Sequence, residues 1–169
     1  MFYNKNKSDN KSRPPSARFS SHPRAKNWHP TLNGDLKPSD LALHSNKKFW
    51  FQCDNCPHSF DISLNNINYE KWCPYCCHNP KLCDDEDCDT CRNKSFASHP
   101  KAKHWHPTLN GEKHPRNLTR GSDKKCWFQC DNCPHSFEAS LWHITGNGRW
   151  CPYCCVPIKK LCDCPDCDI

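Results

Sequence analysis

The sequence predicts a small fold stabilised by metal ions, mostly β-strand and loop with short hairpins and little helix, built twice in tandem. Three observations support this prediction. The chain of 169 residues has a mean hydropathy of -1.00 and 15 prolines, which leave little apolar material for one large core. Its 17 cysteines reach a density typical of disulfide frameworks or metal sites. A long stretch of the sequence also occurs twice.

The internal repeat is the clearest organisational signal. Residues 21–60 align without a gap to residues 98–137, and 28 of the 40 aligned positions are identical. After one inserted residue the match resumes at Trp72 and Trp150 and continues into a cysteine-containing tail in each copy. Similarity at this level means that one structural unit has been duplicated, so both copies should have the same fold.

The repeat sets the expected domain boundaries. We expect a first zinc-binding repeat at residues 19–91 and a second at residues 92–169. Residues 1–18 are rich in Asn, Lys, Ser, Arg and Pro and carry almost no apolar side chains, so we interpret them as a basic N-terminal arm.

The sequence around the cysteines favours metal over disulfides. A secreted protein would open with a basic stretch followed by an apolar run, and residues 1–7 are followed by no such run. No stretch of about 18 apolar residues could span a bilayer. We therefore expect an intracellular, reducing compartment, where thiols stay free to bind metal.

Strand and turn signals surround the first cysteine pair of each repeat. Residues 49–52 and 59–64 are aromatic and apolar runs of strand length, joined by a segment containing Cys53 and Cys56. This pattern predicts a hairpin whose turn is a metal-binding knuckle. Short helical turns are predicted at residues 21–26 and 98–103, with Ser as the N-cap and Pro in the first turn.

Two cysteine pairs per repeat have the spacing of a structural zinc site. Each pair has two residues between its cysteines, and 16 or 17 residues separate the pairs. Two such knuckles let four sulfurs reach one ion at about 2.3 Å, completing a closed tetrahedron. Disulfides and an iron–sulfur cluster are the alternatives. The predicted ligands are Cys53, Cys56, Cys73 and Cys76 in the first repeat, and Cys130, Cys133, Cys151 and Cys154 in the second.

The remaining cysteines suggest a second zinc in each repeat, and four ions in all. They divide into two groups of four, with Cys126 left over at a position that holds Phe49 in the first repeat. Some of them could instead be free, and His78 could replace Cys77 as a ligand. The predicted sets are Cys77, Cys83, Cys88 and Cys91 in the first repeat, and Cys155, Cys162, Cys164 and Cys167 in the second.

Histidines and tryptophans recur in both repeats. His58 and His135 follow the first knuckle closely, but a cysteine pair already fills that half of the site, so we interpret them as groups beside the metal or at the surface. Aromatic residues in a domain this small are usually core. The expected core tryptophans are Trp28, Trp50, Trp72, Trp105, Trp127 and Trp150.

These cysteine and tryptophan motifs resemble those of a known family. Trp50, the first knuckle with His58, and the segment from Trp72 to Cys76 are similar to the zinc-ribbon (treble-clef-like) zinc finger repeat of large DNA viruses of amoebae and some bacteria. The resemblance covers residues 19–169 and implies no catalytic activity. It implies nucleic-acid association only by analogy, because some bacterial copies sit beside nuclease-like domains. Prolines soon after the second cysteine pair favour a short ribbon over a terminal helix.

Charge limits which partners are plausible. The formal charge of +6 favours nucleic acid, but each four-cysteine zinc site changes the charge by about -2, so four zincs reverse the sign. We therefore expect a non-catalytic structural or interaction protein that docks onto a large protein assembly, such as the capsid proteins of a virion. The resemblance implies a viral source, and we expect such a component to be packaged in a virion.

The residues support two other function classes less well. A nucleic-acid-binding zinc finger protein is the alternative, with scattered lysines and arginines against phosphates. An enzyme is not expected, because the predicted ligand sets leave no open coordination position and no catalytic residues or small-molecule substrate are indicated. The basic residues of the nucleic-acid hypothesis are Lys47, Lys48, Arg116, Arg120, Lys124 and Lys125.

Overall fold

The computed structural model describes residues 18–162, and the chain divides into two compact units after Cys77. Each unit contains one copy of the repeat. Residues 78–91, which the sequence analysis assigned to the end of the first repeat, belong to the second unit. The predicted arm lies outside the described residues except for Arg18, whose Nη1 donates to Ser39 O at 3.0 Å.

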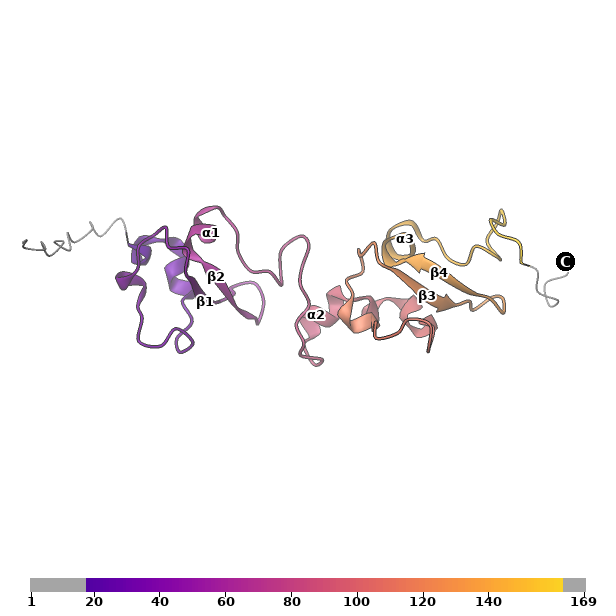
Figure 1. Cartoon of the computed structure of the whole chain (residues 1–169), viewed down its shortest axis with the longest axis horizontal. Coiled ribbons are helices and arrows are strands. Elements are labelled where there is room, and N and C mark those ends of the chain that lie inside the picture. Colours follow the sequence, from indigo (N-terminus) through magenta and orange to yellow (C-terminus); the bar gives the residue numbers. More distant parts are fainter. Residues whose placement is uncertain (1–17, 163–169) are drawn as a thin grey trace, which may run out of the picture. The chain divides into compact units, whose positions relative to one another are not determined.

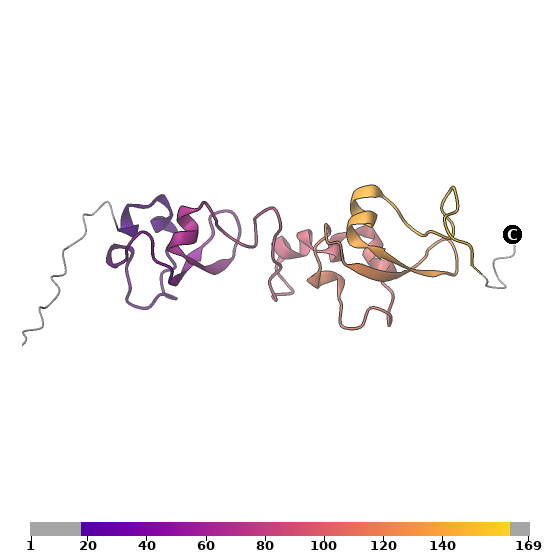
Figure 2. The same ribbon diagram turned by 45° about the horizontal axis from the view of Figure 1, so that its top comes forward.

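The first unit is built on an antiparallel hairpin of β1 (Lys48–Gln52) and β2 (Ser59–Ser63), in which Phe51 lies opposite Phe60. Buried and exposed residues alternate along β1, as expected for a strand with one face on the core. The helix α1 (Leu64–Asn68) follows β2 directly, and Figures 1 and 2 show it beside the hairpin. The Ser63 side chain accepts the Asn66 N–H at 3.2 Å and so begins the helix.

The second unit repeats this arrangement with β3 (Lys125–Gln129), β4 (Ser136–Ser140) and α3 (Leu141–Asn147). It also contains α2 (Asp89–Lys94), which precedes the repeat. No helix among residues 18–162 is long and apolar enough to cross a membrane. Small hairpin sheets and little helix confirm the predicted fold class. The 3₁₀-helices are Phe19–Ser21, Pro23–Asn27, Pro38–Asp40, Phe96–Ser98, Pro100–His104 and Pro115–Asn117.

Phenylalanines form the centre of each core. Phe51 is fully buried, with its ring edge-on to Trp28 at 5.4 Å between centroids, and Phe128 is its equivalent in the second unit. Trp28, Trp72, Trp105 and Trp150 are half-buried and pack against the two cores, whereas Trp127 belongs to neither core and Trp50 is 39% exposed. The prediction of Trp50 as a core residue is therefore wrong: it lies on the outward face of β1, where the side chain is exposed.

The predicted helical turns form, but as 3₁₀-helices with a different cap. His22, not Ser21, precedes Pro23–Asn27, and its Nδ1 accepts the Arg24 N–H at 3.1 Å. The imidazole also stacks on Phe19 at 5.3 Å. His99 caps Pro100–His104 in the same way. A histidine thus caps the turn and covers the core, a role that a serine hydroxyl could fill only in part.

In the second unit, the loop that follows the 3₁₀-helix Pro100–His104 is fastened to β3 by Asn110. Its Oδ1 accepts the Trp127 N–H at 2.8 Å and its Nδ2 donates to Trp127 O at 2.9 Å, so the side chain pairs with the strand as a neighbouring strand would. Asn33 makes both bonds to Trp50 in the first unit. Gly34 and Gly111 follow with φ of 60° and 56°, a left-handed conformation that favours glycine.

Replacing Asn110 tests this attachment. We expect Asn110→Ala to reduce the free energy of unfolding of the second unit by about 1–3 kcal/mol, because it removes two hydrogen bonds at a buried side chain. Chemical denaturation followed by tryptophan fluorescence measures the change. The control Asn147→Ala alters an exposed residue and should change stability by less than about 0.5 kcal/mol. Equal effects of the two substitutions would contradict the role of Asn110.

Candidate metal centres

Four cysteine sulfurs meet at one point in the first unit. Cys53 and Cys56 lie in the turn between β1 and β2, and Cys73 and Cys76 lie in the segment after α1. All four sulfurs lie within 4.8 Å of one another, with Cys53 and Cys76 3.6 Å apart and Cys56 and Cys73 3.5 Å apart. The group therefore joins the hairpin turn to the segment that follows α1 in the sequence.

The second unit brings its equivalent cysteines together in the same way. The sulfurs of Cys130 and Cys154 are 3.6 Å apart, those of Cys133 and Cys151 are 3.5 Å apart, and all four lie within 4.8 Å. All eight cysteines that the sequence assigned to the knuckle pairs thus fall into two four-sulfur groups. We call each of these groups a knuckle group.

The knuckle groups fit a tetrahedral zinc ion. A tetrahedron with metal–sulfur bonds of about 2.3 Å has edges of about 3.8 Å, close to the observed separations of 3.5 and 3.6 Å. A disulfide would need about 2.05 Å, and the cysteines are free. Four thiolates around one ion leave no position for a water molecule, so these centres have the composition of structural sites.

Backbone N–H groups and burial act in opposite directions on the thiols. Burial raises the pKa of Cys53, but hydrogen bonds from the Asn55 N–H and from neighbouring thiols lower it by more. The pKa of Cys53 therefore lies below its usual value. Burial, with the hydrogen bond to Cys53, raises the pKa of Cys76 to about 11. The same N–H groups stabilise the thiolates that zinc requires, and metal binding weakens as the pH falls and protons compete.

The tail cysteines are placed differently from the predicted sets. Cys83, Cys88 and Cys91 lie together in the second unit, with sulfurs within 4.8 Å of one another. Cys77 belongs to the first unit, where its exposed thiol donates to Pro74 O at 3.4 Å. Cys155 likewise donates to Pro152 O at 3.6 Å. In each described tail, the cysteine directly after the second knuckle pair lies within hydrogen-bonding distance of a backbone carbonyl.

The last tail is described only in part. Cys162 Sγ lies 2.8 Å from His135 Nε2, and the other ring nitrogen of His135 lies 3.2 Å from Cys133 Sγ. Cys164 and Cys167 lie outside the described residues. The imidazole therefore contacts both a knuckle cysteine and a tail cysteine. This second contact was not predicted, although a histidine two residues after the first knuckle in both repeats was a usable signal.

The equivalent histidine of the first unit also lies against its knuckle. His58 Nδ1 is 3.3 Å from Cys56 Sγ, and the ring stacks on Tyr75 at 4.2 Å between centroids. Tyr75 stands between the two cysteines of the second pair. His58 thus contacts the first knuckle of its group and stacks on a residue of the second.

An aspartate inside each first knuckle ties it to two other segments. Asp131 accepts Lys101 Nζ and Trp150 Nε1, both at 2.7 Å, and the Lys101 ammonium lies 4.3 Å from the Trp150 ring. Asp54, Arg24 and Trp72 make the same three contacts in the first unit. The 3₁₀-helix, the first knuckle and the tryptophan before the second knuckle are thereby held together. We call this arrangement the knuckle clamp.

Comparison with known families agrees with this geometry. A family model described as a probable treble clef zinc finger domain matches residues 24–79 and 102–157, one match on each repeat. The chain belongs to this treble clef family. A zinc-binding role of the knuckle groups follows from the family and from the sulfur geometry together. The helix of each described treble clef lies between the two cysteine pairs, at α1 and α3, and the segment after the second pair in the first copy is a bend.

A viral protein is similar to most of the chain. An uncharacterized protein of Acanthamoeba polyphaga mimivirus is 36% identical over 148 residues, which cover 85% of this chain. The aligned region makes up 35% of that relative, so the chain spans about a third of its length. This similarity supports the viral branch that the sequence resembled and gives no activity, because the relative carries no functional description.

Loss of one knuckle cysteine should release one zinc and unfold the second treble clef. Structural zinc contributes about 10–16 kcal/mol of binding free energy at pH 7, which is as large as the whole stability of an ordinary domain. We expect Cys154→Ser to lower the zinc content by one ion per chain in native mass spectrometry. The matched control is Cys126→Ala, because Cys126 is buried but belongs to no knuckle group. An unchanged zinc content in Cys154→Ser would contradict the assignment.

The knuckle clamp predicts a graded loss of thermal stability at Asp131. The hydrogen bond from Lys101, with that from Trp150, holds the pKa of Asp131 at about 2, so the carboxylate stays charged throughout the range in which zinc remains bound. Asp131→Asn can still accept the Trp150 N–H, whereas Asp131→Ala loses both contacts. We expect Tm to fall in both variants and further in Asp131→Ala.

The control for this prediction is Glu138→Gln, which removes a long and exposed ion pair with Lys125 at 4.0 Å. Such pairs contribute little, so its Tm should stay close to that of the unmodified chain. A fall in Tm as large as that of Asp131→Ala would show that general charge balance, and not the clamp, controls stability.

Proposed function

We propose that the chain is a non-catalytic interaction protein whose two zinc-bearing knuckle groups stabilise rigid modules that dock onto a large protein assembly. Two ions, one for each knuckle group, account for the eight cysteines of these sites. Each set of four thiolates is complete by itself, so the ions have the form of structural and not catalytic zinc. The proposal therefore concerns binding, and the surface of the modules decides what they bind.

The observation that carries the proposal is an exposed leucine at the same loop position in both treble clefs. Leu32 is 51% exposed and Leu109 is 49% exposed, although each belongs to a loop held firmly against its strand. His29 Nδ1 accepts the Thr31 and Leu32 N–H groups at 3.3 and 3.2 Å. The side chain of the next residue, Asn33, donates to Trp50 O in β1. An apolar side chain fixed in this way can enter a partner without the entropic cost of ordering a loop.

The basic residues give less support to nucleic-acid binding. Arg116 Nη2 donates to Asp85 O at 2.5 Å, and Arg120 donates to the Ser98 hydroxyl at 2.6 and 3.1 Å. Arg24 and Lys101 are held by the knuckle clamps. These cations already have partners inside their own unit, and a phosphate would have to compete with them. Zinc in two knuckle groups also lowers the formal charge from +6 to about +2.

The partner that we propose is a capsid protein of a large DNA virus. The similarity to a mimivirus protein supports a viral source, and an interaction module of this kind could be packaged in the particle. Intracellular synthesis in a reducing compartment is part of the same proposal, since the cysteines of the knuckle groups must remain reduced to bind zinc.

Binding to extracted capsid proteins tests the proposal. The zinc-loaded chain is mixed with capsid proteins extracted from mimivirus particles, and the complex is measured by chemical cross-linking and mass spectrometry. We expect the double variant Leu32→Ser/Leu109→Ser to lower the cross-linked fraction at least about tenfold, the loss that about 1.4 kcal/mol of binding free energy produces. Leu36→Ser is the matched control, because Leu36 is 47% exposed but is replaced by Lys113 in the second repeat.

Nucleic-acid binding provides the opposing outcome. Fluorescence anisotropy with duplex DNA and with single-stranded RNA at about 50 mM salt should show no complex at micromolar protein. Tight binding that weakens steeply with added salt and is unaffected by the leucine substitutions would overturn the proposed function in favour of a nucleic-acid-binding zinc finger. Equal cross-linking of the unmodified chain, the double variant and Leu36→Ser would overturn it as well.

A further inference from the structure

Three cysteines outside the knuckle groups converge in the segment that precedes the second treble clef. Cys83 lies in an extended stretch, Cys88 is the N-cap residue of α2, and Cys91 lies within that helix. Their sulfurs lie within 4.8 Å of one another, and the Cys83 N–H donates to Cys91 Sγ at 3.4 Å. The segment therefore folds back so that one thiol faces two others spaced as in a knuckle.

The turn between these cysteines is fixed by the backbone and by the second treble clef. Cys88 N–H donates to Asp85 O at 3.3 Å, and Asp87 N–H donates to Asp85 Oδ1 at 3.1 Å. The acidic residues 84–87 are exposed, whereas Cys83 and Cys88 are half-buried and Cys91 is buried. Arg116 Nη2 reaches both Asp85 O at 2.5 Å and Cys83 Sγ at 3.8 Å.

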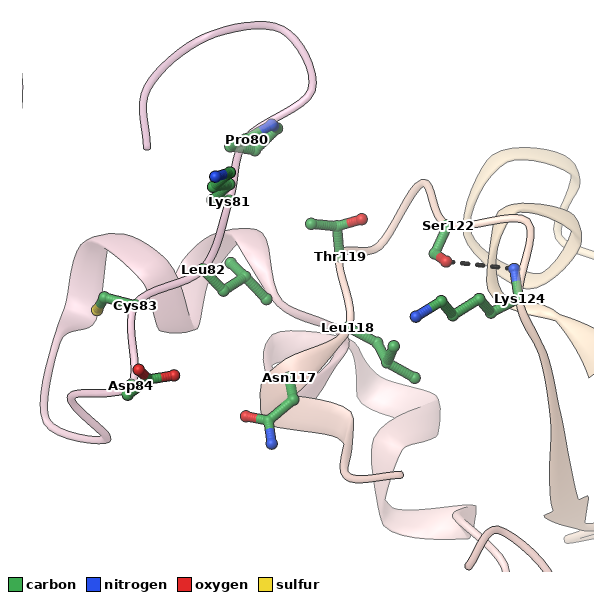
Figure 3. Close-up of a pocket in the computed structure, with 10 residues that line it drawn as sticks. All are labelled: Pro80, Lys81, Leu82, Cys83, Asp84, Asn117, Leu118, Thr119, Ser122 and Lys124. Atoms are coloured by element: carbon green, nitrogen blue, oxygen red, sulfur yellow. Dashed lines mark hydrogen bonds between the residues drawn. The ribbon is translucent and has the colours of Figure 1, made fainter. Parts of the chain in front are cut away.

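The segment also forms one wall of a groove. Residues 80–84 face Asn117, Leu118 and Lys124 across a space of about 480 Å³ (Figure 3). In that view the Cys83 thiol is turned away from the side of the groove on which Lys124 lies. Cys91 is fully buried. Because Cys83 lines the groove and its sulfur lies within 4.8 Å of those of Cys88 and Cys91, an ion bound by the three thiols would hold this wall in place.

We propose that Cys83, Cys88 and Cys91 bind a further zinc ion through three thiolates, with a fourth donor that is not sulfur. Three thiolates within this distance can occupy three corners of a zinc tetrahedron. The fourth sulfur expected from the sequence, that of Cys77, belongs to the first unit and donates to Pro74 O. In the second repeat a tail cysteine, Cys162, meets an imidazole nitrogen at 2.8 Å, which is the kind of donor that completes a three-thiolate site.

The consequence of this site is local order. Zinc bound at Cys83, Cys88 and Cys91 ties the extended residues 80–84 to the start of α2 and so fixes the wall of the groove. Metal removal at this site alone should release the segment while the knuckle groups remain closed. The site is therefore distinguishable from the structural centres of the two treble clefs.

Metal counting on the full chain tests the proposal. Native mass spectrometry compares the zinc content of the unmodified protein with Cys88→Ser and with the matched control Cys77→Ser. We expect Cys88→Ser to lose one ion and Cys77→Ser to lose none. Amide hydrogen exchange in Cys88→Ser should increase at residues 80–92 and stay unchanged in β3 and β4, which shows that the second treble clef is still folded.

Cobalt substitution identifies the donor set. The visible absorption of cobalt-loaded protein, measured as a difference between the unmodified chain and Cys88→Ser, should have the pattern of three sulfurs and one lighter donor. A four-sulfur pattern would overturn the proposal, as would the loss of an ion in Cys77→Ser or full zinc content in Cys88→Ser. None of these results depends on what the treble clefs bind, so failure here leaves the proposed function standing.

Discussion

The knuckle group is the constraint on which each treble clef depends. The hairpin of β1 and β2 and the short helix α1 together bury few large side chains, and a two-stranded hairpin is at best marginally stable alone. The group joins the hairpin turn to the segment after the helix, which closes the unit around Phe51. Zinc binding at such a group supplies free energy on the scale of the whole fold. A small core is then sufficient, because zinc binding supplies most of the stability and the core only has to favour one conformation of the closed chain.

The polar contacts around each group specify that arrangement. The knuckle clamp places Asp54 between Arg24 and Trp72, and the second unit keeps the geometry although the cation changes to Lys101. A guanidinium and an ammonium can both lie over an indole ring and reach a carboxylate, so the contact tolerates the exchange. The contact is kept although Arg24 is replaced by Lys101 in the second unit. The two repeats therefore share the connection between three segments and not one particular side chain.

The sequence predicted what depends on spacing and failed where one side chain could serve several partners. Two residues between cysteines dictate how far two sulfurs can lie from one ion, so all eight knuckle cysteines could be grouped before the structure was known. Counting could not place Cys77, because its neighbour Pro74 offers a carbonyl that the spacing does not reveal. The cap at His22 was missed because an imidazole acting as a backbone acceptor is less common than serine. Trp50 was misplaced because hydrophobicity alone does not tell which face of a strand is buried.

The small size of the core also explains why charge is a poor guide to what this protein binds. A chain with a small core uses its cations as internal fasteners: Arg116 closes a turn by reaching Asp85 O, and Arg120 joins Ser98 to its own loop. Thiolates that hold zinc then add negative charge at each knuckle group. Several of the positive residues counted from the sequence, among them Arg24, Arg116 and Arg120, are therefore committed within the fold. Leu32 and Leu109 are instead about half exposed on loops held by hydrogen bonds, and apolar side chains presented at repeated positions are what a protein partner would recognise.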